Sequence, residues 1–331
     1  MVENKFIISD KRHPDQQEML IGEDHSFLHD AIGRFKKNKG SVFGLIVVII
    51  IFAFAFIGPL ISGTTIDAIE KTHLSLPPRI PFLENFGIFD GVANGVNVYE
   101  AKSLENIYYW FGTDKLGRDL WTRVWSGTQI SFLIAFVAVM IDMVIGVTYG
   151  LISGFAGGKV DTVMQRFVEI LSGIPNLVVV TLFMIVFEPG ITTIILALML
   201  TGWIGMSRVV RSQVLKLKDQ EYVLAAKTLG GSSIKIITKE ILPNIAGQIV
   251  IMMMFSIPNA IFYESFLAFV GLGLRPPLAS LGVLISTGYL SMLTHPFMLT
   301  SSVVVLSLLM LSFNLIADGL KDAFDPKMKG Y

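Results

Sequence analysis

Cysteine is absent from the 331 residues of this chain. Without thiols, disulfide bonds and thiolate chemistry are excluded, whatever the redox compartment. Neither sign of charge is in excess, because 26 Lys and Arg residues balance 26 Asp and Glu residues. No long run of one sign occurs, so the sequence offers no basic surface for nucleic acid.

Three motif classes are missing as well. The sequence has no Gly-rich phosphate loop, no Gly-x-Ser-x-Gly segment and no paired His-Glu helix motif. We therefore expect no catalytic residue, no cofactor and no metal site on this chain. The first 40 residues are polar and lack a short apolar core with a cleavage site. This pattern predicts that no signal peptide is removed and that the first apolar block stays as an anchor.

Apolar residues, by contrast, make up 53% of the chain, above the roughly 45–50% of soluble domains. They fall in blocks of about 20, the length that spans a hydrocarbon core of ~30 Å. The sequence therefore predicts an all-α integral membrane protein with about six transmembrane helices. The predicted spans lie near Val42–Ile61, Ile130–Phe155, Val163–Phe187, Ile191–Met206, Ile245–Leu272 and Phe297–Ile316.

Basic residues are distributed unevenly over the connections between these spans. Of the 26 Lys and Arg residues, 19 fall in the N-terminal tail, after the second and fourth spans and at the C-terminus, whereas seven fall in the other connections. Cytoplasmic connections carry the excess of Lys and Arg in membrane proteins. Both termini are therefore expected in the cytoplasm, which agrees with the even number of spans.

The expected organisation has five segments. They are a cytoplasmic tail (1–40), a first transmembrane helix (41–62), a small extracytoplasmic loop or cap rich in Pro, Gly and aromatic residues (63–127), a five-helix core with a basic cytoplasmic connection at 207–244 (128–320), and a cytoplasmic tail (321–331). Within the first tail, an apolar stripe between Asp24 and Lys39 predicts a helix on the membrane surface. The alternative is an ordinary disordered tail.

The basic connection contains the most informative motif, between Glu221 and Asn244. Tyr222, Ala225, Ala226 and Leu229 recur at i, i+3, i+4 and i+7, so they share one face of a short helix. The two alanines on that face permit the close approach of a partner.

A turn and a second helix are expected after this face. Gly230 and Gly231 allow a left-handed turn that ends the first helix, and Ser232 or Ser233 can cap the second. Pro243 is expected to terminate the second helix. The sequence thus predicts a helix, a sharp turn and a helix, for which a hairpin with no special role is the alternative.

A second motif lies where the chain enters the second span, between Phe111 and Phe132. Gly112 and Gly117 permit tight turns there. The charged residues of this segment can pair locally as the chain enters the membrane, and they are Asp114, Arg118, Asp119 and Arg123. Turn chemistry explains these residues, so a structural role is preferred to direct substrate contact.

Three acids fall inside predicted spans, namely Asp142, Glu169 and Glu264. Ionisable residues within transmembrane segments are candidates for function, because they must face protein or water rather than lipid. The alternative is that they stabilise the bundle through hydrogen bonds. Pro175 and Pro258 are expected to kink the third and fifth spans.

The basic connection resembles the signature loop of ABC importer permeases, E-A-A, three residues, G, nine residues, I, one residue, L-P. The matching positions are Ala225, Ala226, Gly230, Leu242 and Pro243, and the sequence departs from the pattern at Leu224 and Glu240. The segment that begins at Phe111 resembles the F-G-T-D, two residues, G-R-D entry of oligopeptide, dipeptide and nickel permeases. It departs from their pattern at Thr122, Gln129 and Phe132.

This resemblance implies a type I ABC importer permease fold, of the C-type found in oligopeptide and dipeptide systems. It implies no enzymatic activity here, with ATP and Mg bound by two partner ATPases, and a bacterial cytoplasmic membrane location. The other implied partners are a second permease, an extracytoplasmic substrate-binding lipoprotein, peptide and membrane lipid, with no nucleic acid. The residues implied to couple to the ATPase are Glu221, Tyr222, Ala225, Ala226, Leu229, Gly230, Leu242 and Pro243.

The expected substrate is an oligopeptide, with a dipeptide or nickel importer as the alternative because the same motifs occur in those permeases. A more distant alternative is an ion-coupled secondary transporter. Such a transporter is expected to show broken helices in symmetric halves and clustered intramembrane charges, and the sequence shows neither.

Overall fold

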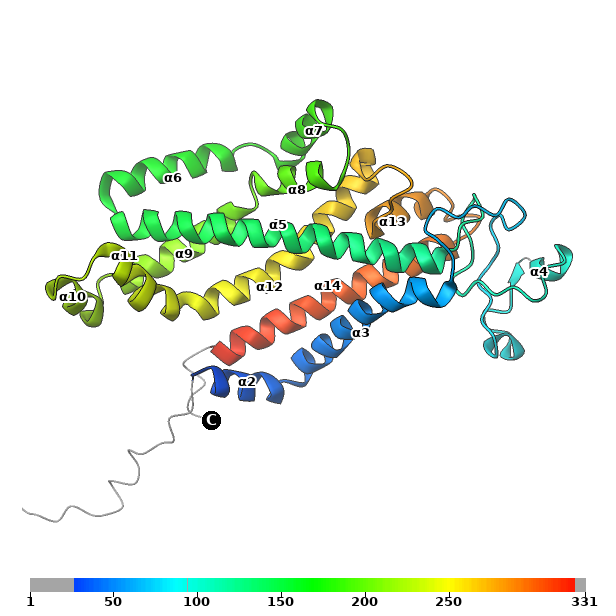
Figure 1. The fold of residues 1–331 in the computed structure, drawn as a ribbon, viewed down its shortest axis with the longest axis horizontal. Helices are drawn as coiled ribbons and strands as arrows, with labels where there is room; N and C mark the ends of the chain where they lie inside the picture. The colour runs from blue at the N-terminus through cyan, green and yellow to red at the C-terminus, as the bar shows by residue number, and fades with distance from the viewer. Residues whose placement is uncertain (1–26, 94, 325–331) are drawn as a thin grey trace, which may run out of the picture.

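The computed structural model describes residues 27–93 and 95–324, and these are mostly helical (Figure 1). The main helices are α2 (Phe27–Lys37), α3 (Lys39–Ser62), α5 (Leu120–Ala156), α6 (Gly158–Ser172), α7 (Asn176–Val186), α8 (Ile191–Met199), α9 (Trp203–Leu217), α10 (Glu221–Thr228), α11 (Ser233–Ile236), α12 (Leu242–Leu267), α13 (Leu281–Tyr289) and α14 (Phe297–Phe324).

The helices α3, α5, α12 and α14 run along the long axis of the molecule (Figure 1). The α10–α11 hairpin lies at one end, called here the hairpin end, and residues 63–119 lie at the opposite end, called the loop end. Among the described residues, five helical stretches are long and apolar enough to cross a membrane, or six if the bent pair α6 and α7 counts as one span. The predicted all-helical membrane fold with about six spans is therefore confirmed.

The third predicted span, Val163–Phe187, contains the kink expected at Pro175. It consists of α6 and α7, which are bent by 76° relative to each other. Proline cannot continue a helix and disfavours helical geometry in the residue before it, so the break falls at Ile174 and Pro175. With 11 residues, α7 is about 16 Å long and too short to cross the bilayer by itself.

Other predicted spans are right in place but too short. Helix α5 begins ten residues before the predicted Ile130, and the fourth stretch, Ile191–Leu217, continues well past Met206. A search for apolar residues finds only the part of a helix that lies in hydrocarbon, so polar helix ends escape it. The helix α13 was not predicted because its nine residues are too few for a membrane span.

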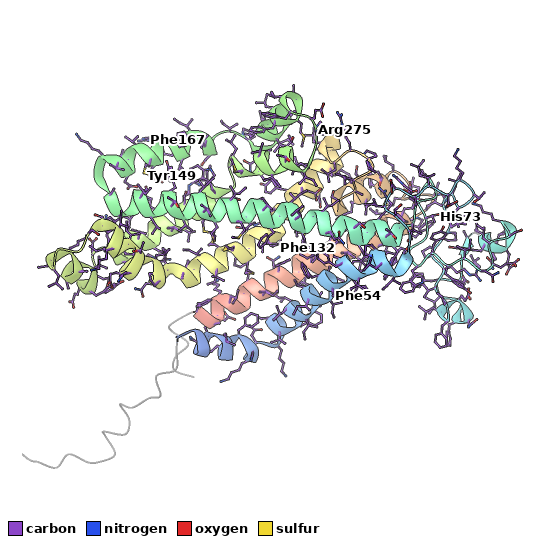
Figure 2. The ribbon with its side chains drawn as sticks, viewed as in Figure 1. Phe54, His73, Phe132, Tyr149, Phe167 and Arg275 are labelled. Carbon is purple, nitrogen blue, oxygen red and sulfur yellow. The ribbon has the colours of Figure 1, made fainter. Side chains whose placement is uncertain are left out.

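Three glycines on α5 allow it to lie close against α9. A Cβ on Gly146 would be 2.7 Å from the Cβ of Met206, and one on Gly150 would be 2.7 Å from the Cβ of Val210. Gly154 meets the next turn of α9 in the same way. Small residues four positions apart are the usual means of close helix packing in membranes. Figure 2 shows Tyr149 on α5, and its hydroxyl donates to the carbonyl of Met164 in α6 at 2.7 Å.

A second core joins α3, α5, α12, α13 and α14. Trp125 of α5 stacks on Phe54 of α3 with the ring centroids 5.1 Å apart, and Phe132 of α5 meets Phe313 of α14 at 6.3 Å. Both Phe54 and Phe132 lie among these helices in Figure 2. Aromatic pairs at such separations contribute about 0.5–1.5 kcal/mol beyond the area they bury.

The loop end is a small folded unit rather than a plain connection. It contains a 3-10 turn at Leu83–Phe86, two paired strands, β1 (Val92–Ala93) and β2 (Val96–Asn97), and the short helix α4 (Val98–Ala101). Leu76, Tyr99 and Tyr109 form its own buried core.

The tail predicted to lie on the membrane surface is helical where the structure describes it, over α2. Residues 24–26 of that prediction lie outside the described residues. The position of α2 at a membrane surface stays a prediction.

Candidate functional site

The α10–α11 hairpin has the turn that the sequence predicts. Gly230 has a φ of +78°, in the left-handed region where side chains are disfavoured. The amide of Gly231 donates to the carbonyl of Ala226 at 3.0 Å, which closes the end of α10. The hydroxyl of Ser232 then accepts from the amide of Lys235 at 3.4 Å and caps α11. These local contacts fix the angle between the two short helices.

The hairpin is anchored by residues that the sequence analysis missed. Val223 and Ile241 are fully buried and Ile236 is 2% exposed, and all three pack with Val214 of α9. Apolar spacing on so short a helix does not reveal which apolar side faces the bundle. The apolar pattern therefore could not show that Val223 is buried and Tyr222 exposed.

The hairpin carries a set of exposed apolar side chains, here called the hairpin surface. It consists of Tyr222, Leu224, Leu229 and Ile234, of which Leu229 is 88% and Ile234 76% exposed. Ala225 and Glu221 are exposed beside it, while Ala226 is only half-exposed and packs partly on the chain's own core. Large exposed apolar groups gathered on one projecting element are typical of a protein contact.

The expectation that Pro243 ends the second helix is wrong. A π-helical stretch, Ile237–Ile241, leads from α11 directly into α12, so that the helical run is continuous from Ser233 to Leu267. Pro243 lies in the first turn of α12, where its missing amide is tolerated. Leu242 packs partly against the core of the hairpin. The hairpin is therefore joined to a membrane-spanning helix without a loop.

A half-buried ion pair at the hairpin end also escaped the sequence analysis. Arg211 of α9 donates from Nε and Nη2 to the two carboxylate oxygens of Asp161 in α6, both at 2.6 Å. Ser153 of α5 donates to the same carboxylate. Fork-like arginine contacts of this kind are the stronger ion pairs in proteins. They hold α5, α6 and α9 together next to the hairpin.

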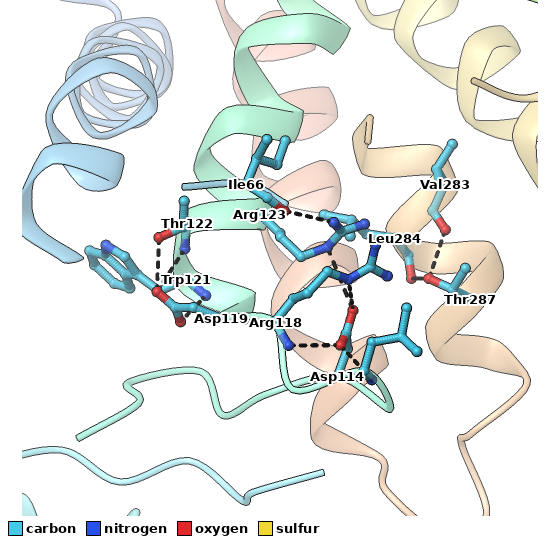
Figure 3. A network of polar contacts seen from close by, with 11 residues as sticks. Ile66, Asp114, Arg118, Asp119, Trp121, Thr122, Arg123, Val283, Leu284 and Thr287 are labelled. Carbon is cyan, nitrogen blue, oxygen red and sulfur yellow. Dashed lines mark hydrogen bonds and ion pairs between the residues drawn. The ribbon is translucent and has the colours of Figure 1, made fainter. Parts of the chain in front are cut away.

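The charged motif at the loop end forms a second network (Figure 3). Arg118 donates from Nε to Asp114 at 2.7 Å, and the amide of Arg118 donates to the same carboxylate at 3.0 Å. Arg123 is 3.8 Å from Asp114 and donates to the carbonyl of Ile66 at 3.0 Å. The guanidinium groups thus fasten the loop to the start of α5.

Asp119 begins α5 as its N-cap. Its carboxylate accepts from the amides of Trp121 at 3.0 Å and Thr122 at 3.4 Å, as Figure 3 shows. It also accepts from the hydroxyls of Ser62, the last residue of α3, and of Thr64 just beyond it. Asp119 therefore joins the end of α3 to the start of α5.

Two tyrosines within the loop end are shielded from water. Burial, together with the nearby carboxylates of Asp119 and Glu70, raises the pKa of Tyr109 to about 12. Burial also raises the pKa of Tyr99. The Tyr109 hydroxyl stays protonated at physiological pH and lies 2.7 Å from Nδ1 of His73. This pair adds to the core of the loop end.

The three intramembrane acids have different surroundings. Glu264 of α12 is fully buried and accepts from Ser131 of α5 at 3.1 Å, while Ser131 accepts from the amide of Leu281 at 3.2 Å. Glu264 therefore links three helices. Glu169 is 56% exposed and pairs with Arg166 at 2.7 Å on the outer side of α6. It has no place in the bundle interior.

Asp142 lines a cavity of about 440 Å³ between α5, α7, α9 and α12. Its polar lining consists of Asp142, Asn176, Thr201, Ser256, Asn259 and Tyr263. Within residues 27–93 and 95–324, no three His, Cys, Asp or Glu side chains gather as metal ligands. The cavity suits a small organic group better than a metal ion.

Comparison with known proteins gives two family matches and several relatives. The family described as binding-protein-dependent transport system inner membrane component matches residues 146–330, and the N-terminal TM domain of oligopeptide transport permease C matches residues 26–78. The dipeptide transport system permease protein DppC of Bacillus subtilis is 42% identical, over 92% of this chain and 87% of the relative. The oligopeptide transport system permease protein OppC of the same organism is 39% identical, over 94% and 93%.

A solved structure has a similar fold. A chain of the MetNI methionine ABC transporter in an inward-facing conformation has a TM-score of 0.52 and 17% identity, over 61% of this chain and 97% of that chain. The likeness supports the type I ABC importer permease fold. With the two family matches and the relatives, it shows that the chain belongs to the family of binding-protein-dependent transport system inner membrane components.

Proposed function

We propose that this chain is a permease subunit of an ATP-driven importer of peptides, with an oligopeptide as its substrate. The observation that carries the proposal is the 39–43% identity, over more than nine-tenths of the chain, to permeases named for dipeptide and oligopeptide transport. A dipeptide substrate is the second candidate, because the relatives of 42% and 43% identity are dipeptide permeases.

The chain is proposed to form the translocation path together with a second, related permease. Substrate reaches this path from an extracytoplasmic binding lipoprotein, and two ATPase subunits hydrolyse ATP with Mg on the cytoplasmic side. The chain performs no chemistry itself. The unequal distribution of Lys and Arg supports cytoplasmic termini in a bacterial cytoplasmic membrane, with the hairpin end inside.

The hairpin surface is proposed as the contact with an ATPase subunit. Tyr222, Leu229 and Ile234 are exposed apolar side chains on an element that projects from the bundle. The helical run from Ser233 to Leu267 would carry a displacement of the hairpin into the membrane. The residues proposed for coupling are Glu221, Tyr222, Ala225, Ala226, Leu229, Gly230, Leu242 and Pro243.

Uptake by a reconstituted transporter tests the proposal. The complete complex in proteoliposomes, supplied with its binding protein, is expected to accumulate radiolabelled tri-alanine when ATP is enclosed, and to do so only then. Parallel uptake of di-alanine separates the two candidate substrates by their relative rates. If neither peptide enters faster with ATP than without it, the proposed substrate class is wrong.

A further inference from the structure

The cavity around Asp142 lies on a side of the bundle that is polar at membrane depth. Asp142 is 14 residues from the end of α5, about 21 Å along the helix axis. The cavity opens between exposed residues of three other helices, Asn176 of α7, Gly205 of α9 and Asn259 of α12. Polar side chains at such depth do not face lipid. This side of the chain therefore faces another protein subunit or a water-filled path.

Asp142 has an unusual setting within the cavity. Its Oδ1 atom is buried and has no hydrogen-bond partner among the described residues. Its Oδ2 atom lies so close to Gly202 that a Cβ at that position would overlap it. The carboxylate of Asp142 therefore lies directly against the backbone at Gly202.

The described cavity lining contains no Lys, Arg or His side chain. An unpaired carboxylate away from water is costly, and a cation that binds to it removes much of that cost. The rings of Tyr263 and Phe266 also line the cavity, and aromatic faces attract ammonium groups. The lining therefore favours an organic cation.

The remaining lining suits groups of variable shape. Met206 and Met252 are part of it, and methionine adapts its conformation to different neighbours. Every unmodified peptide carries one ammonium group at its amino terminus, whatever its side chains. A single carboxylate beside adaptable walls can therefore hold peptides of any sequence by this one shared group.

We propose that Asp142 binds the protonated amino terminus of the peptide as it passes through this cavity. The inference rests on the proposed function, because it takes a peptide as the substrate. It assigns to this chain a recognition site of its own, in addition to any selection by a binding protein.

The first test measures the charge preference of the cavity. Because the native chain has no cysteine, Asn259→Cys introduces a single thiol into this chain of the complete transporter. Its rates of modification by trimethylammonioethyl and sulfonatoethyl methanethiosulfonate are followed by mass spectrometry. Asp142→Asn is expected to lower the cation-to-anion rate ratio by about tenfold, as for the loss of a contact with a charged group.

The matched control is Glu264→Gln, which removes one acid from the same bundle outside the cavity and should leave the rate ratio unchanged. An unchanged ratio in Asp142→Asn would overturn the proposal. That outcome would mean that the carboxylate is already neutralised, for example by a basic residue of the second permease.

The second test asks whether the site recognises the charged amino terminus of a peptide. Tri-alanine is expected to slow the modification of Asn259→Cys by the cationic reagent, whereas N-acetyl-tri-alanine is not. The difference should vanish in Asp142→Asn. Equal protection by both peptides, or none by either, would refute the site. Uptake of tri-alanine by the wild-type complex would still support the proposed function. The proposed site at Asp142 and the proposed function can therefore fail separately.

Discussion

Gly230 offers a sharp test of the hairpin as the coupling element. A Cβ at this position would meet no atom within 4 Å, so a substitution changes the turn only through its φ of +78°. An ordinary L-residue in this conformation costs about 1–2 kcal/mol, and a β-branched one more, whereas Asn adopts it readily. Gly230→Val should therefore disfavour the observed turn by about tenfold or more, since 1.4 kcal/mol corresponds to a factor of ten.

The assay compares Gly230→Val with Gly230→Asn in the reconstituted complex. Peptide uptake and substrate-stimulated ATP hydrolysis should fall together in the valine variant and stay near the wild-type values in the asparagine variant. Subunit stoichiometry, measured on the same samples, shows whether docking is lost. Wild-type rates in Gly230→Val would refute the reasoning. An equal loss in both variants would show that side-chain bulk, and not the turn, matters here.

A second pair of variants separates docking from the turn. Ala225 is exposed, whereas Ala226 packs partly on the chain's own core. Ala225→Leu should weaken docking alone. Ala226→Leu should also strain the hairpin, since overpacking costs about 1–3 kcal/mol. A complex that keeps its ATPase subunits in Ala225→Leu would place the contact elsewhere.

Three further predictions follow from the fold. In intact cells, an impermeant thiol reagent should label a single cysteine at Ala93 but not one at Ser232. Labelling at Ser232 and not at Ala93 would overturn the proposed orientation. Gly150→Leu should destabilise the purified complex by about 1–3 kcal/mol and so lower its melting temperature, because its Cβ would lie 2.7 Å from the Cβ of Val210 and push α5 away from α9. An unchanged melting temperature would contradict the close packing. Glu264→Leu should lower complex yield more than Glu264→Gln, which retains an acceptor for Ser131, and equal yields would deny the buried link.

Local sequence signals predicted the features that depend on local physics. The turn at Gly230 and the cap at Ser232 need only the residues beside them, and the structure contains both. The apolar blocks likewise located the membrane helices. The size of the bend at Pro175 could not be predicted, because a proline predicts a break but the angle depends on what packs on each side.

Tertiary contacts account for the rest. Val223 is buried only because α9 and α11 come together above it, and the spacing of apolar residues cannot show this. Pro243 was expected to stop a helix, but the π-helical stretch before it shifts the backbone so that the proline falls in a first turn. The cavity around Asp142 is built from helices far apart in sequence, so no motif could reveal it.

The continuity from the hairpin to α12 has a pharmacological consequence. Ile236, in the hairpin, and Asn259, in the cavity wall, belong to one helical run with no loop between them, about 35 Å apart along the axis. A small molecule wedged beside Asn259 would restrain this rod and thereby immobilise the hairpin at its far end. A compound that binds in this cavity would therefore inhibit ATP hydrolysis without binding at the nucleotide site.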